Sequence, residues 1–199
     1  METNLVNPAF AHDLFVHLRV IVGIVLGLSL TRLVSGLTQF VQHPHIYKVD
    51  LLHIGWVVYL LVSIIHFWWF EFALSGIQVW TFQKYVFLIG YAMLFVFLST
   101  LLFPENIREY GTHAQYFQDR RQWFYAILAV TFIIDPLDTM MKGPAYIQAL
   151  GDEYWIKQAI YALCAIIAIF VASKTYQAVF LVIGLIYEIV WIIRVYDVL

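Results

Sequence analysis

Long runs of apolar residues, separated by short polar stretches, divide the chain into regular intervals. About six runs are long enough to cross a membrane, roughly residues 14–40, 51–75, 81–103, 121–141, 154–173 and 175–196. The hydrocarbon core of a bilayer requires roughly 20 mainly apolar residues per helix. The pattern therefore predicts an all-α, polytopic membrane protein, built as a compact bundle of about six transmembrane helices.

The polar stretches between these runs are too short to hold a soluble domain. The connection VQHPHIYKVD follows the first run, and a tight SKTY separates the fifth run from the sixth. Connections of this length usually join neighbouring elements directly. We therefore expect residues 1–199 to form a single transmembrane helical domain with short loops. An even number of crossings places both chain ends on one side, called here the terminal face, opposite the loop face.

Positive charges near the segment ends bear on orientation, because Lys and Arg are enriched in cytoplasmic loops. The loop face carries slightly more of them, which would place both chain ends outside the cytoplasm. The count is Lys84, Lys142 and Lys157 on the terminal face against Lys48, Arg108, Arg120, Arg121 and Lys174 on the loop face.

Composition supports the membrane assignment. Of the 199 residues, 63% are hydrophobic and only 12% are charged, whereas soluble domains carry about 25% charged residues. A chain this apolar cannot bury its surplus in one core, so its solvent is the lipid bilayer, and we expect a multi-pass protein of the cell membrane. The net charge of −2 gives no reason to expect nucleic acid as a partner.

Several charged side chains fall at one depth when each run is counted from the terminal face. An unpaired charge in mid-bilayer costs on the order of 3 kcal/mol, so we expect these residues to face one another as an intramembrane polar cluster. Within it, Glu188 is expected to face the bundle interior, with either an arginine, of which Arg19 is the nearest in depth, or water as its partner. Alternatively, the arginines extend to lipid headgroups and Glu71 simply ends its helix. The cluster comprises Arg19, His66, Glu71, Asp135, Glu188 and Arg194.

The fourth run is short and is followed by DPLDTMMKGP. Either the helix continues through Pro136 with a kink, or it stops at Ile134 and Asp135 caps a new short helix. Broken helices that carry carboxylates at membrane depth mark ion and substrate sites in transporters. Asp135 and Asp138 could also offer oxygens to a hard cation.

Two further groups of residues have alternative interpretations. Toward the loop face, Arg32 and His53 could line a pore vestibule, and Arg32 could equally bind a lipid phosphate or the C-terminus of a helix. In the first run, Gly23, Gly27 and Thr31 recur every fourth residue and form one narrow helix face. Small residues at this spacing allow close helix packing, either within one subunit or between subunits.

Signatures of enzymatic chemistry are missing from the sequence. It contains no HExxH, no GxSxG and no P-loop, so we expect no catalytic residues and no enzyme activity. The histidines on the first two runs are poorly placed for a haem, and we expect no cofactor and no metal.

Two classes of function are consistent with the sequence. The first is a homo-oligomeric channel or carrier that moves an ion or small solute through the polar cluster. The second is a non-transporting accessory or effector subunit that acts by assembling in the bilayer. A cavity continuous with the cluster would favour transport. A dry, fully paired cluster with an outward-facing glycine stripe would favour the accessory role.

Overall fold

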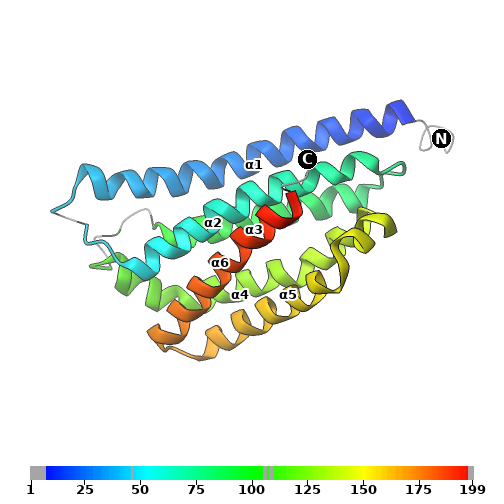
Figure 1. The fold of residues 1–199 in the computed structure, drawn as a ribbon. Helices are drawn as coiled ribbons and strands as arrows, with labels where there is room; N and C mark the ends of the chain where they lie inside the picture. Colours follow the sequence, from blue (N-terminus) through cyan, green and yellow to red (C-terminus); the bar gives the residue numbers. More distant parts are fainter. Residues whose placement is uncertain (1–7, 46, 105–106, 108–109, 197–199) are drawn as a thin grey trace.

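The computed structural model describes residues 8–45, 47–104, 107 and 110–196. Over these residues the chain is all-helical, with six helices long and apolar enough to cross a membrane. The prediction of a multi-pass bundle of about six transmembrane helices is confirmed. The helices (Figure 1) are α1 (Pro8–Gln42), α2 (Leu51–Phe70), α3 (Phe82–Leu102), α4 (His113–Met141), α5 (Pro144–Phe170) and α6 (Lys174–Tyr196).

Polar side chains at the ends of the loops define where the helices begin. The Asp50 carboxylate accepts a hydrogen bond from the His53 backbone N–H at 2.9 Å, which satisfies one of the free donors at the start of α2. Thr81 and Thr112 cap α3 and α4 in the same way. Three helices extend further into the polar stretches than the apolar runs indicated. Arg108, counted above on the loop face, lies outside the described residues.

The helix α4 continues through Pro136 and ends at Met141. The first of the two alternatives for this segment is therefore correct, and Asp135 is not the cap of a separate helix. Because α4 does not stop at Ile134, its last turns carry Asp138 to the terminal-face end of the bundle, with Lys142 directly after them.

Three helix irregularities lie in the terminal half of the bundle. The last turn of α2 passes into a short 3-10 helix, η2 (Glu71–Gly76). Pro136 removes a backbone donor inside α4, and Gly151 interrupts α5 with φ 67° and ψ −174°. A positive φ of this kind is readily adopted only by glycine. The helices α2 (Leu51–Phe70) and α3 (Phe82–Leu102) have no comparable interruption within these bounds.

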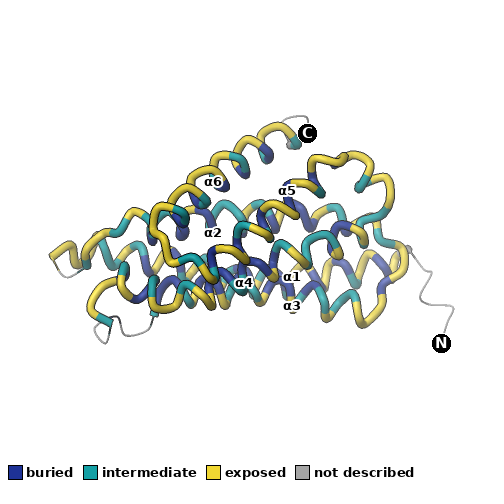
Figure 2. Tube along the Cα trace, turned by 90° about the horizontal axis from the view of Figure 1, so that it is seen from below, coloured by how far each residue is buried: buried dark blue, intermediate teal, exposed yellow. Residues whose placement is uncertain are grey.

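The interior of the bundle is filled mainly by aromatic and aliphatic side chains. Figure 2 shows buried positions facing between the helices and exposed positions along the outside. Toward the loop face the ring of Trp56 lies 5.2 Å from Phe124, 5.4 Å from Tyr125 and 5.5 Å from Phe180 between ring centroids. We call these four residues the aromatic layer. Its ring contacts join α2, α4 and α6 in the interior of the bundle.

Candidate functional site

The carboxylate of Asp135 is the meeting point of three helices in the terminal half of the bundle. Tyr91 of α3 donates a hydrogen bond to its Oδ1 at 2.7 Å, and Tyr154 of α5 donates to its Oδ2 at 2.6 Å. The Gln158 amide donates to the same Oδ2. No cation of the described residues forms an ion pair with Asp135, so its charge is met by neutral donors alone.

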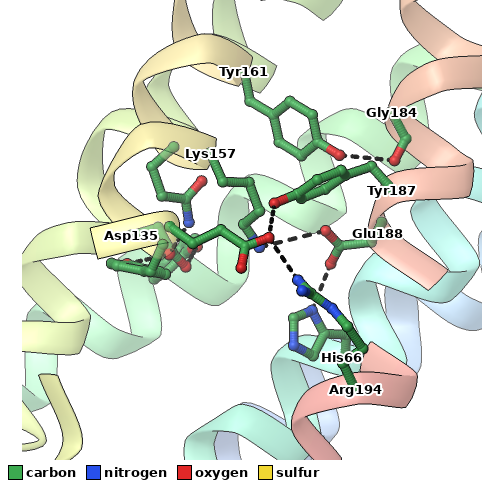
Figure 3. Close-up of polar contacts among 12 residues, drawn as sticks. His66, Asp135, Lys157, Tyr161, Gly184, Tyr187, Glu188 and Arg194 are labelled. Atoms are coloured by element: carbon green, nitrogen blue, oxygen red, sulfur yellow. Dashed lines mark hydrogen bonds and ion pairs between the residues drawn. The ribbon is translucent and has the colours of Figure 1, made fainter. Parts of the chain in front are cut away.

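Glu188 of α6 is buried and faces the interior. Its Oε1 lies 2.6 Å from Nδ1 of His66 on α2, and its Oε2 lies 3.6 Å from Nζ of Lys157 on α5. The Lys157 ammonium also lies over the ring of Trp191, 4.7 Å from its centroid. In Figure 3 the side chains of His66 and Lys157 approach Glu188 from two different helices. One carboxylate therefore connects α2, α5 and α6.

A second ionic group lies beside the first, where η2 meets the end of α4. The Lys142 ammonium donates to Oε1 of Glu71 at 2.9 Å and to Asp138 one turn earlier, and it lies 3.6 Å from the centroid of the Phe70 ring. Burial lowers the pKa of Lys142, but the two carboxylates raise it by more, so the net shift is upward. Lys142 is therefore a fixed positive charge. We call Glu71, Asp138 and Lys142 the ionic lock.

A cavity of about 60 Å³ lies at the centre of the site. On the same measure one water molecule needs about 10–15 Å³, so the cavity has room for only a few small molecules. Its floor is aromatic, with Tyr59, Phe67 and Tyr161 among the lining residues. Its polar lining comes from five helices and consists, apart from the Tyr59 and Tyr161 hydroxyls, of Ser63, His66, Tyr91, Thr131, Asp135, Tyr154, Lys157, Gln158 and Glu188.

The structure brings together only part of the predicted polar cluster. His66, Asp135 and Glu188 share the cavity, and Glu71 lies next to it in the ionic lock. Arg19, which we expected beside Glu188, instead lies over the Phe72 ring at 5.6 Å in a groove between α1 and η2.

Arg194 also lies apart from the cavity. Its guanidinium donates to Glu153 at 2.5 Å, in a pair that is about half exposed. The arginines of the predicted cluster are thus replaced at the buried carboxylates by Lys157 and Lys142. Helix order and depth do not fix the direction in which a side chain points around its helix, and this is why the predicted pairing was wrong.

The sequence interpretation missed the two lysines and the amide that complete the site. Lys142 and Lys157 were counted as surface charges of the terminal face, but both side chains are almost fully buried. One signal was available, because Asp138 and Lys142 are four residues apart and so share a helix face. No comparable signal pointed to Gln158.

Arg32 and His53 both bind the C-terminal end of α3, close to the loop face. The Arg32 guanidinium donates to the Phe103 carbonyl oxygen from Nε at 3.0 Å and from Nη2 at 2.6 Å. Nε2 of His53 lies 2.7 Å from the Leu102 carbonyl oxygen. Carbonyl groups at a helix end have no partner within the helix, and these contacts satisfy them. Of the alternatives for Arg32, the contact observed is that with a helix C-terminus.

The small-residue face of α1 is divided between two environments. A Cβ atom placed on Gly23 would lie 2.2 Å from the Trp68 ring, so this glycine is used for packing within the subunit. A Cβ on Gly27 would meet nothing within 4 Å, and Thr31 is exposed. Self-association through this face stays a prediction.

The described residues contain no group of three or more His, Cys, Asp or Glu side chains placed to hold a metal ion. Comparison of the chain with protein-family models, with curated proteins and with solved structures gives no match.

Proposed function

We propose that this chain is a carrier of the cell membrane, which moves an ion or small polar solute through the cavity at Asp135 and Glu188. The observation that carries the proposal is the cavity itself. It is continuous with the buried carboxylates rather than separate from them. A cluster serving only to hold helices together has no need of such a space.

The closed side of the cavity favours a carrier over an open channel. The aromatic layer fills the bundle between the cavity and the loop face. Beyond it, Gln118 and Gln177 donate to each other at 3.0 and 3.2 Å across α4 and α6. A carrier exposes its site to one side at a time, and such a barrier on one side of a central site is what that cycle requires.

The three helix irregularities supply the means of movement. The α2–η2 junction, Pro136 and Gly151 all lie in the half of the bundle that holds the cavity. Helices interrupted near a binding site can shift their two parts relative to one another, as in the discontinuous helices of known transporter folds. We propose that these points are the hinges, and we assign no catalytic step to the site.

One observation favours the alternative of an accessory subunit that acts by assembly. The outward side of α1 carries exposed apolar side chains beside the open Gly27, including Val20, Ile24 and Leu28. A homo-oligomer joined through this face is compatible with both functions. The two are separated by whether the purified protein moves solute.

The experiment is a flux assay in sealed vesicles that contain only the purified chain. Ion and small-solute movement is followed under imposed pH and potential gradients, with a pH-sensitive dye inside the vesicles. We expect flux with the wild type and none with Glu188→Gln, which should still assemble normally. Glu153→Gln is the matched control, because it makes the same change at an exposed position. Wild-type vesicles as tight as empty ones to the whole panel would contradict the proposal and favour the accessory role.

A further inference from the structure

We propose that the cavity takes a small monovalent cation with N–H groups, of the size of ammonium or methylammonium, bound between Asp135 and Gln158. This assignment of the cargo rests on the proposed function. The supporting observations concern the volume of the cavity, the charge of its lining and the hydrogen-bonding capacity left open on its walls.

The volume limits the cargo to a few heavy atoms. The cavity measures about 60 Å³, whereas an engineered apolar cavity that binds benzene measures about 150 Å³. Sugars and amino acids are therefore too large for the site as it stands. An ammonium ion is close to the size of water, and methylammonium adds one methyl group.

The charge of the lining selects a cation. Asp135 and Glu188 are two carboxylates, and Lys157 is one ammonium, so the Asp, Glu, Lys and Arg side chains of the lining carry a formal net charge of −1. Lys157 is already engaged by Glu188 and by the Trp191 ring. The uncompensated charge is therefore that of Asp135. At membrane depth an uncompensated charge is costly, and one bound cation neutralises the lining.

The open hydrogen-bond acceptors select a cation that donates N–H groups. A carboxylate has about four acceptor sites, and Asp135 uses three of them for Tyr91, Tyr154 and Gln158. The remaining site is on Oδ1. The Gln158 side chain is more than nine-tenths buried, lines the cavity, and its Oε1 has no hydrogen-bond partner among the described residues. Leaving such an oxygen buried and unsatisfied is unfavourable, because it has lost its hydrogen bonds to water.

The aromatic walls fit the same cargo. The rings of Tyr59, Phe67, Tyr91 and Tyr161 surround the cavity. Their faces attract organic cations, more strongly where water is excluded. A hard metal cation would instead require about six oxygen ligands, and no group of three or more His, Cys, Asp or Glu side chains among the described residues is placed to hold one. An ammonium-type ion can use two acceptors and direct its remaining surface at the rings.

The test is calorimetric titration of the purified full chain in detergent, with methylammonium chloride as the probe. We expect one site per chain, and no displacement by potassium chloride or by tetramethylammonium chloride, which is larger and has no N–H group. Asp135→Asn should lose at least about tenfold in affinity, since a hydrogen bond to a charged group contributes about 1.5–3 kcal/mol. Glu153→Gln is the control for removal of a carboxylate.

Gln158→Met keeps the length of the side chain and removes both its open acceptor and the amide that donates to Asp135, so it should weaken binding by about tenfold. Gln148→Met is the matched control, because it makes the same change at an exposed position of α5. If Asp135→Asn fails to fold, the comparison of these two variants decides. Wild-type protein that binds no methylammonium, or binds tetramethylammonium equally well, overturns the proposal, as does a Gln158→Met variant of unchanged affinity.

These outcomes are separable from those of the flux assay, because binding in detergent requires no gradient and no transport. Binding that depends on Asp135 without any vesicle flux would retain the site and reject the carrier. Flux of a different solute without methylammonium binding would retain the carrier and reject this cargo.

Discussion

The two halves of the bundle treat buried polar residues in opposite ways. In the loop half, Arg32 and His53 bind backbone carbonyls at the end of α3, and Gln118 binds Gln177. In the terminal half, charged side chains bind other charged side chains around a cavity. The loop half is thus closed by contacts that complete the backbone, while the terminal half concentrates groups that can exchange partners.

The difference shows that a polar residue at membrane depth is not by itself the sign of a pathway. Arg32 and His53 both lie within helices that could cross the membrane, but their hydrogen bonds go to a helix end that would otherwise be unsatisfied. Asp135 and Glu188 complete no backbone group among the described contacts. What separates the two cases is the partner of each residue, and the following substitutions test that separation.

The largest effect is expected for Lys142→Met in the ionic lock. The substitution leaves Glu71 and Asp138 buried without a cation, at a cost of roughly 3–5 kcal/mol in the free energy of unfolding. Thermal unfolding of the purified variant measures the loss, and Lys174→Met, at an exposed position, is the control. Because the pKa of Lys142 is raised, its contribution is fully present below pH 10.5 and is lost only as pH rises through that raised pKa. Equal stability of the two variants would contradict the lock.

The second largest loss of stability is expected for Glu188→Ala. This substitution removes the carboxylate that contacts His66 and leaves the Lys157 ammonium buried without its partner. We expect a loss of roughly 3 kcal/mol in the free energy of unfolding, with Glu153→Ala near neutral by comparison. Glu188→Gln should be milder, since the amide still offers an oxygen to its neighbours. A Gln variant as unstable as the Ala variant would indicate that the negative charge is the main structural requirement.

Arg32→Met sharpens the comparison from the loop half. It removes two hydrogen bonds to the Phe103 carbonyl, and we expect a loss of about 1.5–3 kcal/mol in the free energy of unfolding. Transport in vesicles should be unchanged per folded protein, because the contact is with the backbone. A changed ion preference in the flux assay would instead indicate that Arg32 lines a pore vestibule.

The smallest effects on stability are expected along α1, where two glycines should behave differently. A Cβ on Gly36 would lie 2.4 Å from the buried ring of Phe103, so Gly36→Ala should cost about 1–3 kcal/mol through overpacking. Gly27→Leu should leave the unfolding temperature of the subunit unchanged and weaken self-association. Light scattering in mild detergent measures the second effect. If the wild type and the Gly27→Leu variant are both monomeric, the predicted interface does not exist.

Most of the fold could be predicted from the sequence, because six apolar runs leave few alternatives in a bilayer. The helix ends were less predictable. The helix α5 begins at Pro144, ten residues before its apolar run, since a cluster of polar residues is compatible with a helix that passes into the headgroup region. Pro136 left two outcomes open, and only the packing of α4 against its neighbours decided between them.

For the candidate site, the sequence indicated the approximate membrane depth of several residues but not which residues contact one another. Counting residues from the terminal face grouped Asp135 with Glu188 and His66, about one turn deeper, in one leaflet, because each residue of a helix advances a fixed distance, and these three residues line one cavity. It assigned Arg19 to Glu188 because Arg19 is the nearest cation in depth on a different helix. However, α1 packs mainly on α3, and Arg19 points to the groove beside Phe72. Pairing depends on rotation about the helix axis and on which helices are neighbours, and neither is encoded in depth.

In electrical terms, the aromatic layer is the part of the bundle across which most of the membrane potential is expected to fall. A polar cavity on one side and the Gln118–Gln177 pair on the other shorten the distance over which a membrane potential falls. A potential of 100 mV is worth about 2.3 kcal/mol for one charge that crosses it completely. Under the proposed function, most of that work is done on the cargo in the single step past Trp56 and Phe180. Voltage would then govern the rate of crossing, while the loading of the cavity would depend on concentration alone.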